Sequence, residues 1–126
     1  VPKPGELAAR AEEVAPGVRL VAHAGPWESI DALKSTAKEV RGILGSGVVA
    51  LALEADEPQL FVTVSDDLVA RGLAAGDLVR AAMAALGGKG GGRPEMAQGK
   101  GTQRDAIPAA LAAVRAAVGA VGPAGG

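Results

Sequence analysis

Hydrophobic positions along the chain follow two periods, one typical of helices and one typical of strands. Between Ser29, which can cap a helix, and Gly45, which can end one, apolar residues recur at steps of three and four. Residues 48–53 instead form an unbroken apolar run, which predicts a strand covered on both faces. The predicted elements in chain order are a helix over 6–14, a strand over 18–24, a helix over 30–44, strands over 48–53 and 60–64, a short helix over 68–73, a helix over 76–86 and a last helix with Ile107, Leu111, Val114, Val118 and Val121 on its apolar face. This order, αβαββααα, predicts a single small α/β (α+β) domain with a mixed sheet flanked by helices.

A glycine-rich segment precedes the last predicted helix. Residues 87–101 read GGKGGGRPEMAQGKG, seven glycines in fifteen residues, which predicts a loop. Glycine adds entropy to the unfolded chain, so some function or contact should require it here. The segment and the three residues after it carry Lys89, Arg93, Lys100 and Arg104 against a single glutamate. Bare backbone N–H groups with nearby cations suit a phosphate, and the alternative is a connector whose basic residues are simply solvated.

The same segment lacks the spacing of the common nucleotide-binding loops. Lys100 is followed by glycine rather than by the Ser or Thr of a P-loop, and no glycine stands five residues before Gly99. Arg93 occupies the third glycine position of a dinucleotide fingerprint, and no predicted strand precedes the segment. The glycines therefore predict neither a P-loop nor a dinucleotide site.

A second basic pattern lies on the predicted helix over 30–44. Lys34, Lys38 and Arg41 recur at steps of four and three, so they share one face of that helix. Like charges at this spacing repel by roughly 0.2 to 0.5 kcal/mol per pair, and a polyanion would relieve the repulsion. The alternative is an ordinary solvated face.

Composition excludes several classes of protein. With 126 residues, 48% of them hydrophobic, the chain is long enough for one core and too short for two domains. The absence of cysteine excludes disulfides, a thiolate nucleophile and zinc ribbons. Aromatic residues make up only 2% of the chain, too few for a base-stacking sheet. A net charge of −1 excludes a histone-like binder, so nucleic acid would have to meet a local patch.

The remaining polar candidates have structural explanations. Ser65, Asp66 and Asp67 begin the short predicted helix, where unpaired N–H groups favour hydroxyls and carboxylates. Trp27 is expected to anchor its loop to the core, and His23, without catalytic partners at a suitable spacing, has a structural or surface role. We therefore predict no catalytic residue, no metal site and no cofactor in this chain.

The glycine-rich segment resembles the signature of the DHH-associated domain found at the C-terminus of alanyl-tRNA synthetases. Similarity extends through 33–49, 62–68 and 75–79 and covers roughly residues 18–118. The resemblance implies three parts, listed in order: the end of a helical lead-in over 1–16, the DHH-associated domain over 17–122 and a disordered tail over 123–126. Because the chain begins without Met, we expect a piece of a longer protein, although processing would leave the same start.

In that family the domain is understood as a tRNA-binding module that contacts the elbow of the L-shaped tRNA. The resemblance implies a cytoplasmic parent alanine-tRNA ligase whose aminoacylation and editing this chain assists. The implied partners are alanine-specific tRNA and the rest of the synthetase, with no membrane. The glycine motif is carried over from the family, and the basic contacts rest on electrostatics. The expected RNA-binding residues are Lys34, Lys38, Arg41, Lys89, Gly90, Gly91, Gly92, Arg93, Gln98, Lys100 and Arg104.

Two alternatives remain open. The same domain type accompanies DHH-family phosphodiesterases, where a related loop helps to hold a phosphate near a metal centre. Those proteins typically have a histidine after the three glycines, where this chain has Arg93, and the Asp-His-His metal motif is absent here. The other alternative is an interaction domain that forms a homodimer through the last helix or the first.

Overall fold

The computed structural model describes residues 1–121, so the predicted disordered tail over 123–126 lies outside the described residues. The elements in chain order are α1 (Pro4–Ala9), β1 (Glu12–Ala15), β2 (Val18–Gly25), α2 (Ile30–Leu44), β3 (Val48–Leu53), β4 (Gln59–Val64), α3 (Asp66–Ala70), α4 (Ala75–Leu86), β5 (Lys89–Gly92), β6 (Met96–Lys100), the 3-10 helix η1 (Arg104–Ala106) and α5 (Ile107–Gly119).

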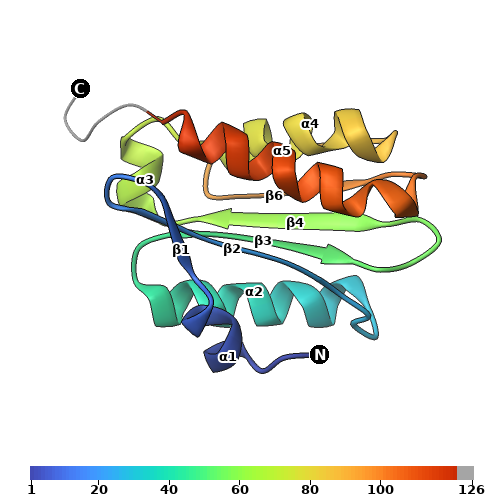
Figure 1. Cartoon of the computed structure of the whole chain (residues 1–126), viewed down its shortest axis with the longest axis horizontal. Coiled ribbons are helices and arrows are strands. Elements are labelled where there is room, and N and C mark those ends of the chain that lie inside the picture. Colours follow the sequence, from blue (N-terminus) through green and yellow to red (C-terminus); the bar gives the residue numbers. More distant parts are fainter. Residues whose placement is uncertain (122–126) are drawn as a thin grey trace.

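The six strands form one mixed sheet in the order β1-β2-β3-β4-β6-β5. β2 and β3 are parallel and joined through α2, whereas every other neighbouring pair is antiparallel. Figure 1 shows α1 and α2 on one face of the sheet and α4 and α5 on the other. The predicted mixed sheet flanked by helices is confirmed, and β1 and β5 are its two edges.

The central strands separate two hydrophobic cores. Even-numbered residues of β3 belong to the core under α4 and α5, and odd-numbered residues belong to the core under α2. All of them are buried, as the unbroken apolar run predicted. The helix α2 begins and ends where expected: the Ser29 hydroxyl accepts a hydrogen bond from the Ala32 N–H at 3.1 Å, and Gly45 follows the last turn with φ +73°.

The helix predicted over 6–14 is wrong in its second half. α1 ends at Ala9, and residues 12–15 form β1, which pairs antiparallel with the start of β2. Pairing satisfies the backbone of this segment while Val14 packs against the core and Ala15 is buried, so tertiary contacts override helix propensity. Gly17, with φ +74°, makes the tight turn between the two strands.

The loop predicted over 87–101 is also wrong, because it contains β5 and β6. These two strands pair antiparallel with each other, and β6 also pairs with β4. Composition favoured a loop because glycine weakens an isolated strand. Here the pairing with β4 and the packing against α4 supply the missing stability. The chain order is thus αββαββααββ followed by η1 and α5.

The last helix uses its apolar face inside the domain. Val114 and Val118 are fully buried in the core under α4 and α5, and Leu111 and Val121 pack against the same core. Leu7 of α1 is likewise buried, against the core under α2. The apolar faces of these two helices therefore pack inside the domain, and the homodimer alternative stays a prediction. Within residues 1–121 no helix has the length and apolar character needed to cross a membrane.

Candidate RNA-binding surface

The hairpin of β5 and β6 packs against α4 so closely that Gly90 and Gly99 have no room for side chains. A Cβ atom at Gly90 would lie 2.7 Å from Val79 Cγ1, and one at Gly99 would lie 2.7 Å from Met83 Sδ. At Gly76, on the helix side of the contact, a Cβ atom would lie 2.9 Å from a carbonyl oxygen of β5. The glycines are required because the side chains of Val79 and Met83 in α4 pack directly on the hairpin backbone, and at Gly76 the helix backbone itself meets the strand.

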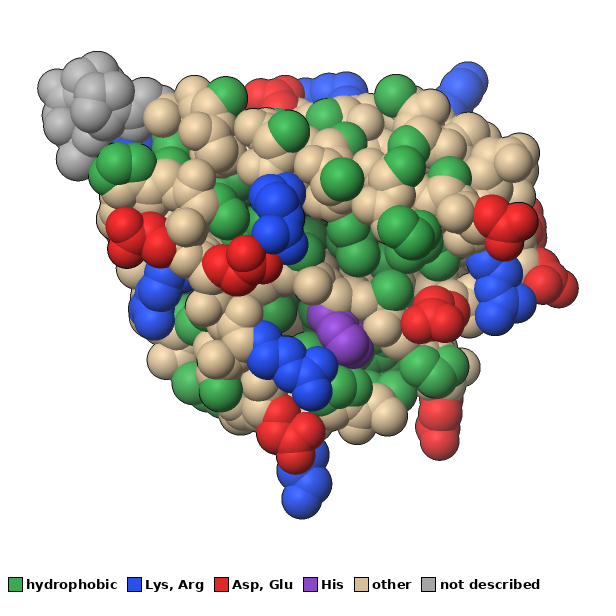
Figure 2. All heavy atoms as spheres, viewed as in Figure 1, with side chains coloured by type: hydrophobic (Ala, Val, Ile, Leu, Met, Phe, Trp, Pro, Cys, Tyr) green, Lys and Arg blue, Asp and Glu red, His purple; other side chains and the backbone are tan. Residues whose placement is uncertain are grey.

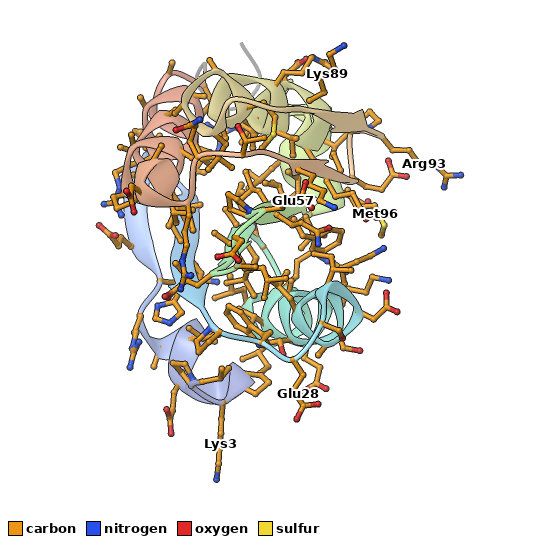
Figure 3. The ribbon with its side chains drawn as sticks, turned by 90° about the vertical axis from the view of Figure 1, so that its right-hand side faces the viewer. Lys3, Glu28, Glu57, Lys89, Arg93 and Met96 are labelled. Atoms are coloured by element: carbon orange, nitrogen blue, oxygen red, sulfur yellow. The ribbon has the colours of Figure 1, made fainter. Side chains whose placement is uncertain are left out.

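A shallow groove separates the other side of the hairpin from α2. It has a volume of about 210 Å³, and its lining residues are Lys34, Phe61, Gly91, Gly92, Arg93, Met96, Ala97 and Gln98. Figure 3 shows Arg93 projecting away from the molecule and Met96 between the hairpin and α2. The groove therefore joins the glycine-rich segment to the basic face of α2, two patterns that are far apart in the sequence.

Two cations border this groove and differ in how they are held. Lys34 Nζ lies 5.6 Å from the centre of the Phe61 ring and makes no ion pair within residues 1–121. Arg93 Nη1 lies 3.8 Å from Glu95 Oε1, and 81% of the Arg93 side chain is exposed. Surface pairs of this length contribute little, so both cations are available to an incoming phosphate.

Most of the other residues expected to bind RNA lie outside this groove. Lys38 and Arg41 continue the face of α2 that carries Lys34 but do not line the groove. Lys89 and Gly90 line a separate hollow beside α4. Lys100 Nζ and Arg104 Nη1 lie 3.3 Å and 3.5 Å from carboxylates of Glu57 and Asp56, which both belong to the turn between β3 and β4. The first pair attaches the end of β6 to that turn, and the second attaches η1 to it.

The sequence analysis did not predict three of the residues that line the groove: Phe61, Met96 and Ala97. Phe61 could have been found, because the alternation of β4 places it on the face toward α2, where Lys34 lies one turn into the helix. Met96 had no such signal, since it fell in a segment predicted to be a loop.

Ser65 and Asp67 connect two turns, and the Ser65 side chain makes no capping hydrogen bond to α3. The Ser65 hydroxyl accepts a hydrogen bond from the Gly47 N–H at 3.0 Å and donates one to Asp67 at 2.6 Å. The Ser46 hydroxyl donates a second bond to the same carboxylate, also at 2.6 Å. Hydrogen bonds from Ser46 and Ser65 together lower the pKa of Asp67. Within residues 1–121, no group of three or more His, Cys, Asp or Glu side chains could hold a metal ion.

Trp27 anchors its loop to the core as predicted, with only 8% of its surface exposed. Its ring meets the His23 ring edge-on, with centroids 6.2 Å apart. Burial, and then the charge of Arg10, lower the pKa of His23. Figure 2 shows this histidine on the face that carries β1 and α5, where cationic and acidic side chains lie next to one another.

Comparison with known proteins identifies the family to which this chain belongs. The DHHA1 domain matches residues 20–120 of this chain. The chain belongs to the DHHA1 domain family. A curated relative, the alanine-tRNA ligase of Magnetococcus marinus, is 45% identical to this DHHA1 domain over 98 residues, which is 78% of the chain. The chain spans only 11 to 13% of the length of such relatives.

Solved structures share the fold of this DHHA1 domain. The C-Ala domain of Aquifex aeolicus alanyl-tRNA synthetase superposes with a TM-score of 0.78 at 24% identity, covering 87% of this chain and 98% of that one. RecJ from Thermus thermophilus superposes with a TM-score of 0.70 at 19% identity, covering 96% of this chain and 17% of that one. At these identities the likeness concerns the fold alone.

Proposed function

We propose that this DHHA1 domain is a tRNA-binding module of an alanine-tRNA ligase, and that the groove between α2 and the hairpin contacts the tRNA elbow. The observation that carries the proposal is the groove itself, where Lys34 meets Gly91, Gly92 and Arg93. Alanine-tRNA ligases that match 78 to 90% of this chain support the identity of the parent protein.

The groove suits an exposed base pair bordered by phosphates. Gly91 and Gly92 present backbone without side chains, and Met96 adds an apolar surface beside them, so a flat base pair can approach closely. Lys34 and Arg93 would meet the flanking phosphates, and the exposed Gln98 amide would donate or accept a hydrogen bond. In the parent ligase, a cytoplasmic enzyme in this proposal, such a tethered contact raises the effective concentration of tRNA at the aminoacylation and editing sites.

The fold similarity to RecJ favours a second candidate, the phosphate-binding domain of a DHH-family phosphodiesterase. The 45% identity to an alanine-tRNA ligase, against 19% to RecJ, supports the first candidate more strongly. The sequence of the parent gene decides between them, because an upstream Asp-His-His region would identify the phosphodiesterase.

Fluorescence anisotropy tests the elbow contact. The 126-residue chain is titrated with intact tRNA and with a tRNA whose elbow is disrupted, and the variants Lys34→Ala and Arg93→Ala are compared with the control Lys3→Ala. Lys3 is a suitable control because it is exposed before α1, away from the hairpin (Figure 3). We expect elbow-dependent binding that weakens about fivefold in each groove variant and is unchanged in the control. Equal binding of the two tRNAs would contradict the elbow contact.

A further inference from the structure

A second groove lies on the α4 side of the edge strand β5. It has a volume of about 380 Å³, and its lining residues are Arg80, Met83, Ala84, Gly88, Lys89 and Gly90. None of these residues lines the groove beside α2, so β5 separates the two. The second groove also contains two cations, one from the helix and one from the strand.

Arg80 reaches from α4 to the bare backbone of β5. Its Nη2 atom donates to the carboxylate of Asp77, one turn earlier in the helix, and 58% of its side chain remains exposed. Its Nη1 atom faces the strand, because a Cβ atom added at Gly91 would lie only 3.3 Å from it. Gly91 also lines the groove beside α2. The guanidinium group therefore lies at the ridge between the two grooves, held in place by Asp77.

Lys89 stands at the start of β5 and Arg93 follows its end. Figure 3 shows both side chains pointing away from the body of the domain. Lys89 is exposed and makes no ion pair within the part of the chain that the structure describes. Four residues of extended strand span about 13 Å, so cations lie at both ends of a strand whose middle carries no side chain.

We propose that the groove beside α4 is a second site for RNA phosphate, in which Arg80 and Lys89 are the binding cations. The inference rests on the proposed function and extends it: the RNA backbone crosses the bare edge of β5, with Lys34 and Arg93 on one side and Arg80 and Lys89 on the other. The planar guanidinium group of Arg80 can donate two hydrogen bonds to phosphate oxygens, and Lys89 supplies a point charge. Asp77 is the carboxylate beside this groove, and its bond to Nη2 leaves Nη1 directed at the strand.

Binding of tRNA to the 126-residue chain, measured by anisotropy over a series of salt concentrations, tests the second site. The variants are Arg80→Ala, Lys89→Ala and Lys34→Ala. The matched control is Arg115→Ala, because Arg115 is an exposed arginine with a carboxylate partner, Glu12, at the opposite edge of the sheet. We expect Arg80→Ala and Lys89→Ala each to weaken binding about fivefold and to reduce the slope of log affinity against log salt by about 1. The control should leave both quantities unchanged.

The outcomes separate this inference from the proposed function. If Lys34→Ala weakens binding while Arg80→Ala and Lys89→Ala behave like the control, the second site is wrong and the groove beside α2 stands. If none of the variants weakens binding, the proposed function fails as well. If Arg115→Ala weakens binding as much as Arg80→Ala, the effect is general electrostatic attraction and the second site is overturned.

Discussion

The two edge strands of the sheet, β1 and β5, differ in their side chains and in the charges around them. At the β1 edge, the strand is short, its register shifts between Glu13 and Ala15, and its exposed residues are glutamates. The carboxylate of Glu12 pairs with Arg115 of α5 at 2.7 Å, which ties the strand to the helix above it. Irregular pairing and charge are common ways to protect an edge strand from adding another strand.

At the β5 edge, three consecutive glycines leave the backbone uncovered. Four cations lie beside it, Lys34 and Arg93 on one side and Arg80 and Lys89 on the other, against the two carboxylates of Asp77 and Glu95. Carboxylates at the β1 edge repel a polyanion, whereas bare amides and cations at the β5 edge attract one. The chain as a whole is nearly neutral, with a net charge of −1, so this difference arises from placement rather than from composition.

The largest expected effect is a loss of stability when a side chain is added where β5 packs against α4. A Cβ atom in Gly90→Ala would lie 2.5 Å from the Gly99 Cα atom and 2.7 Å from Val79 Cγ1. Backbone cannot move aside cheaply, so we expect a loss of about 3 kcal/mol in the free energy of unfolding, measured by urea denaturation.

The neighbouring substitution Gly91→Ala provides the matched control for that loss. The added methyl group would meet only the flexible end of Arg80, so we expect a change below about 1 kcal/mol. If both alanine variants lose the same free energy of unfolding, the close contacts of Gly90 are not the cause of its loss.

The next effect concerns RNA binding without loss of stability. Gly91→Val adds a side chain to both the groove and the ridge where Arg80 lies. Valine is favourable in a strand, so the melting temperature should hold while tRNA affinity falls about tenfold, or roughly 1.4 kcal/mol. Anisotropy and thermal melting on the same sample check both statements. Unchanged affinity in this folded variant would mean that RNA does not approach the bare strand.

Sequence patterns predicted the interior of this fold well and its edges poorly. The helix α2 and the strand β3 were placed correctly because each buries a periodic or continuous apolar surface. Residues 12–14 were assigned to a helix and residues 89–100 to a loop, yet both segments contain edge strands. Each edge strand pairs with the next strand along the chain, but the resulting hairpin joins the sheet only because β2 pairs with β3 and β6 pairs with β4. Those pairings link segments distant in sequence, which local composition does not encode.

The sequence predicted the parts of the candidate site separately, but it did not predict that they lie together. The glycines and the basic face of α2 were each recognised, but their meeting at one groove depends on β6 pairing with β4. Arg80 was not recognised because on its own helix it resembles an ordinary pair with Asp77. Lys100 and Arg104 each lie beside a carboxylate of a turn more than forty residues earlier, a pairing that charge counts do not reveal. Their expected contact with phosphate stays a prediction.

A smaller effect is expected at the protected edge. Removing the pair between Glu12 and Arg115 in a double-mutant cycle should give a coupling of about 0.2 to 1 kcal/mol, because both side chains are about half exposed. The coupling should shrink as salt rises, and tRNA binding should not change in either single variant. A coupling that persists at high salt would point to packing rather than to charge at this edge.

The smallest expected effect is a pH dependence on the face that carries β1. Burial lowers the pKa of His23 below its ordinary value of 6.5, so the folded state favours the neutral ring. The unfolded chain then binds the proton more readily, and the stability that this group contributes is complete above about pH 6.5 and is lost as pH falls toward the lower folded pKa. The melting temperature of the unmodified chain should fall between pH 7.5 and pH 5, and in His23→Gln this fall should be smaller. The difference should be at most about 2 °C, because the ring is partly exposed and its charge is therefore screened. Affinity for tRNA at pH 7.5 should be the same in both proteins, since His23 lies away from both grooves of the β5 edge.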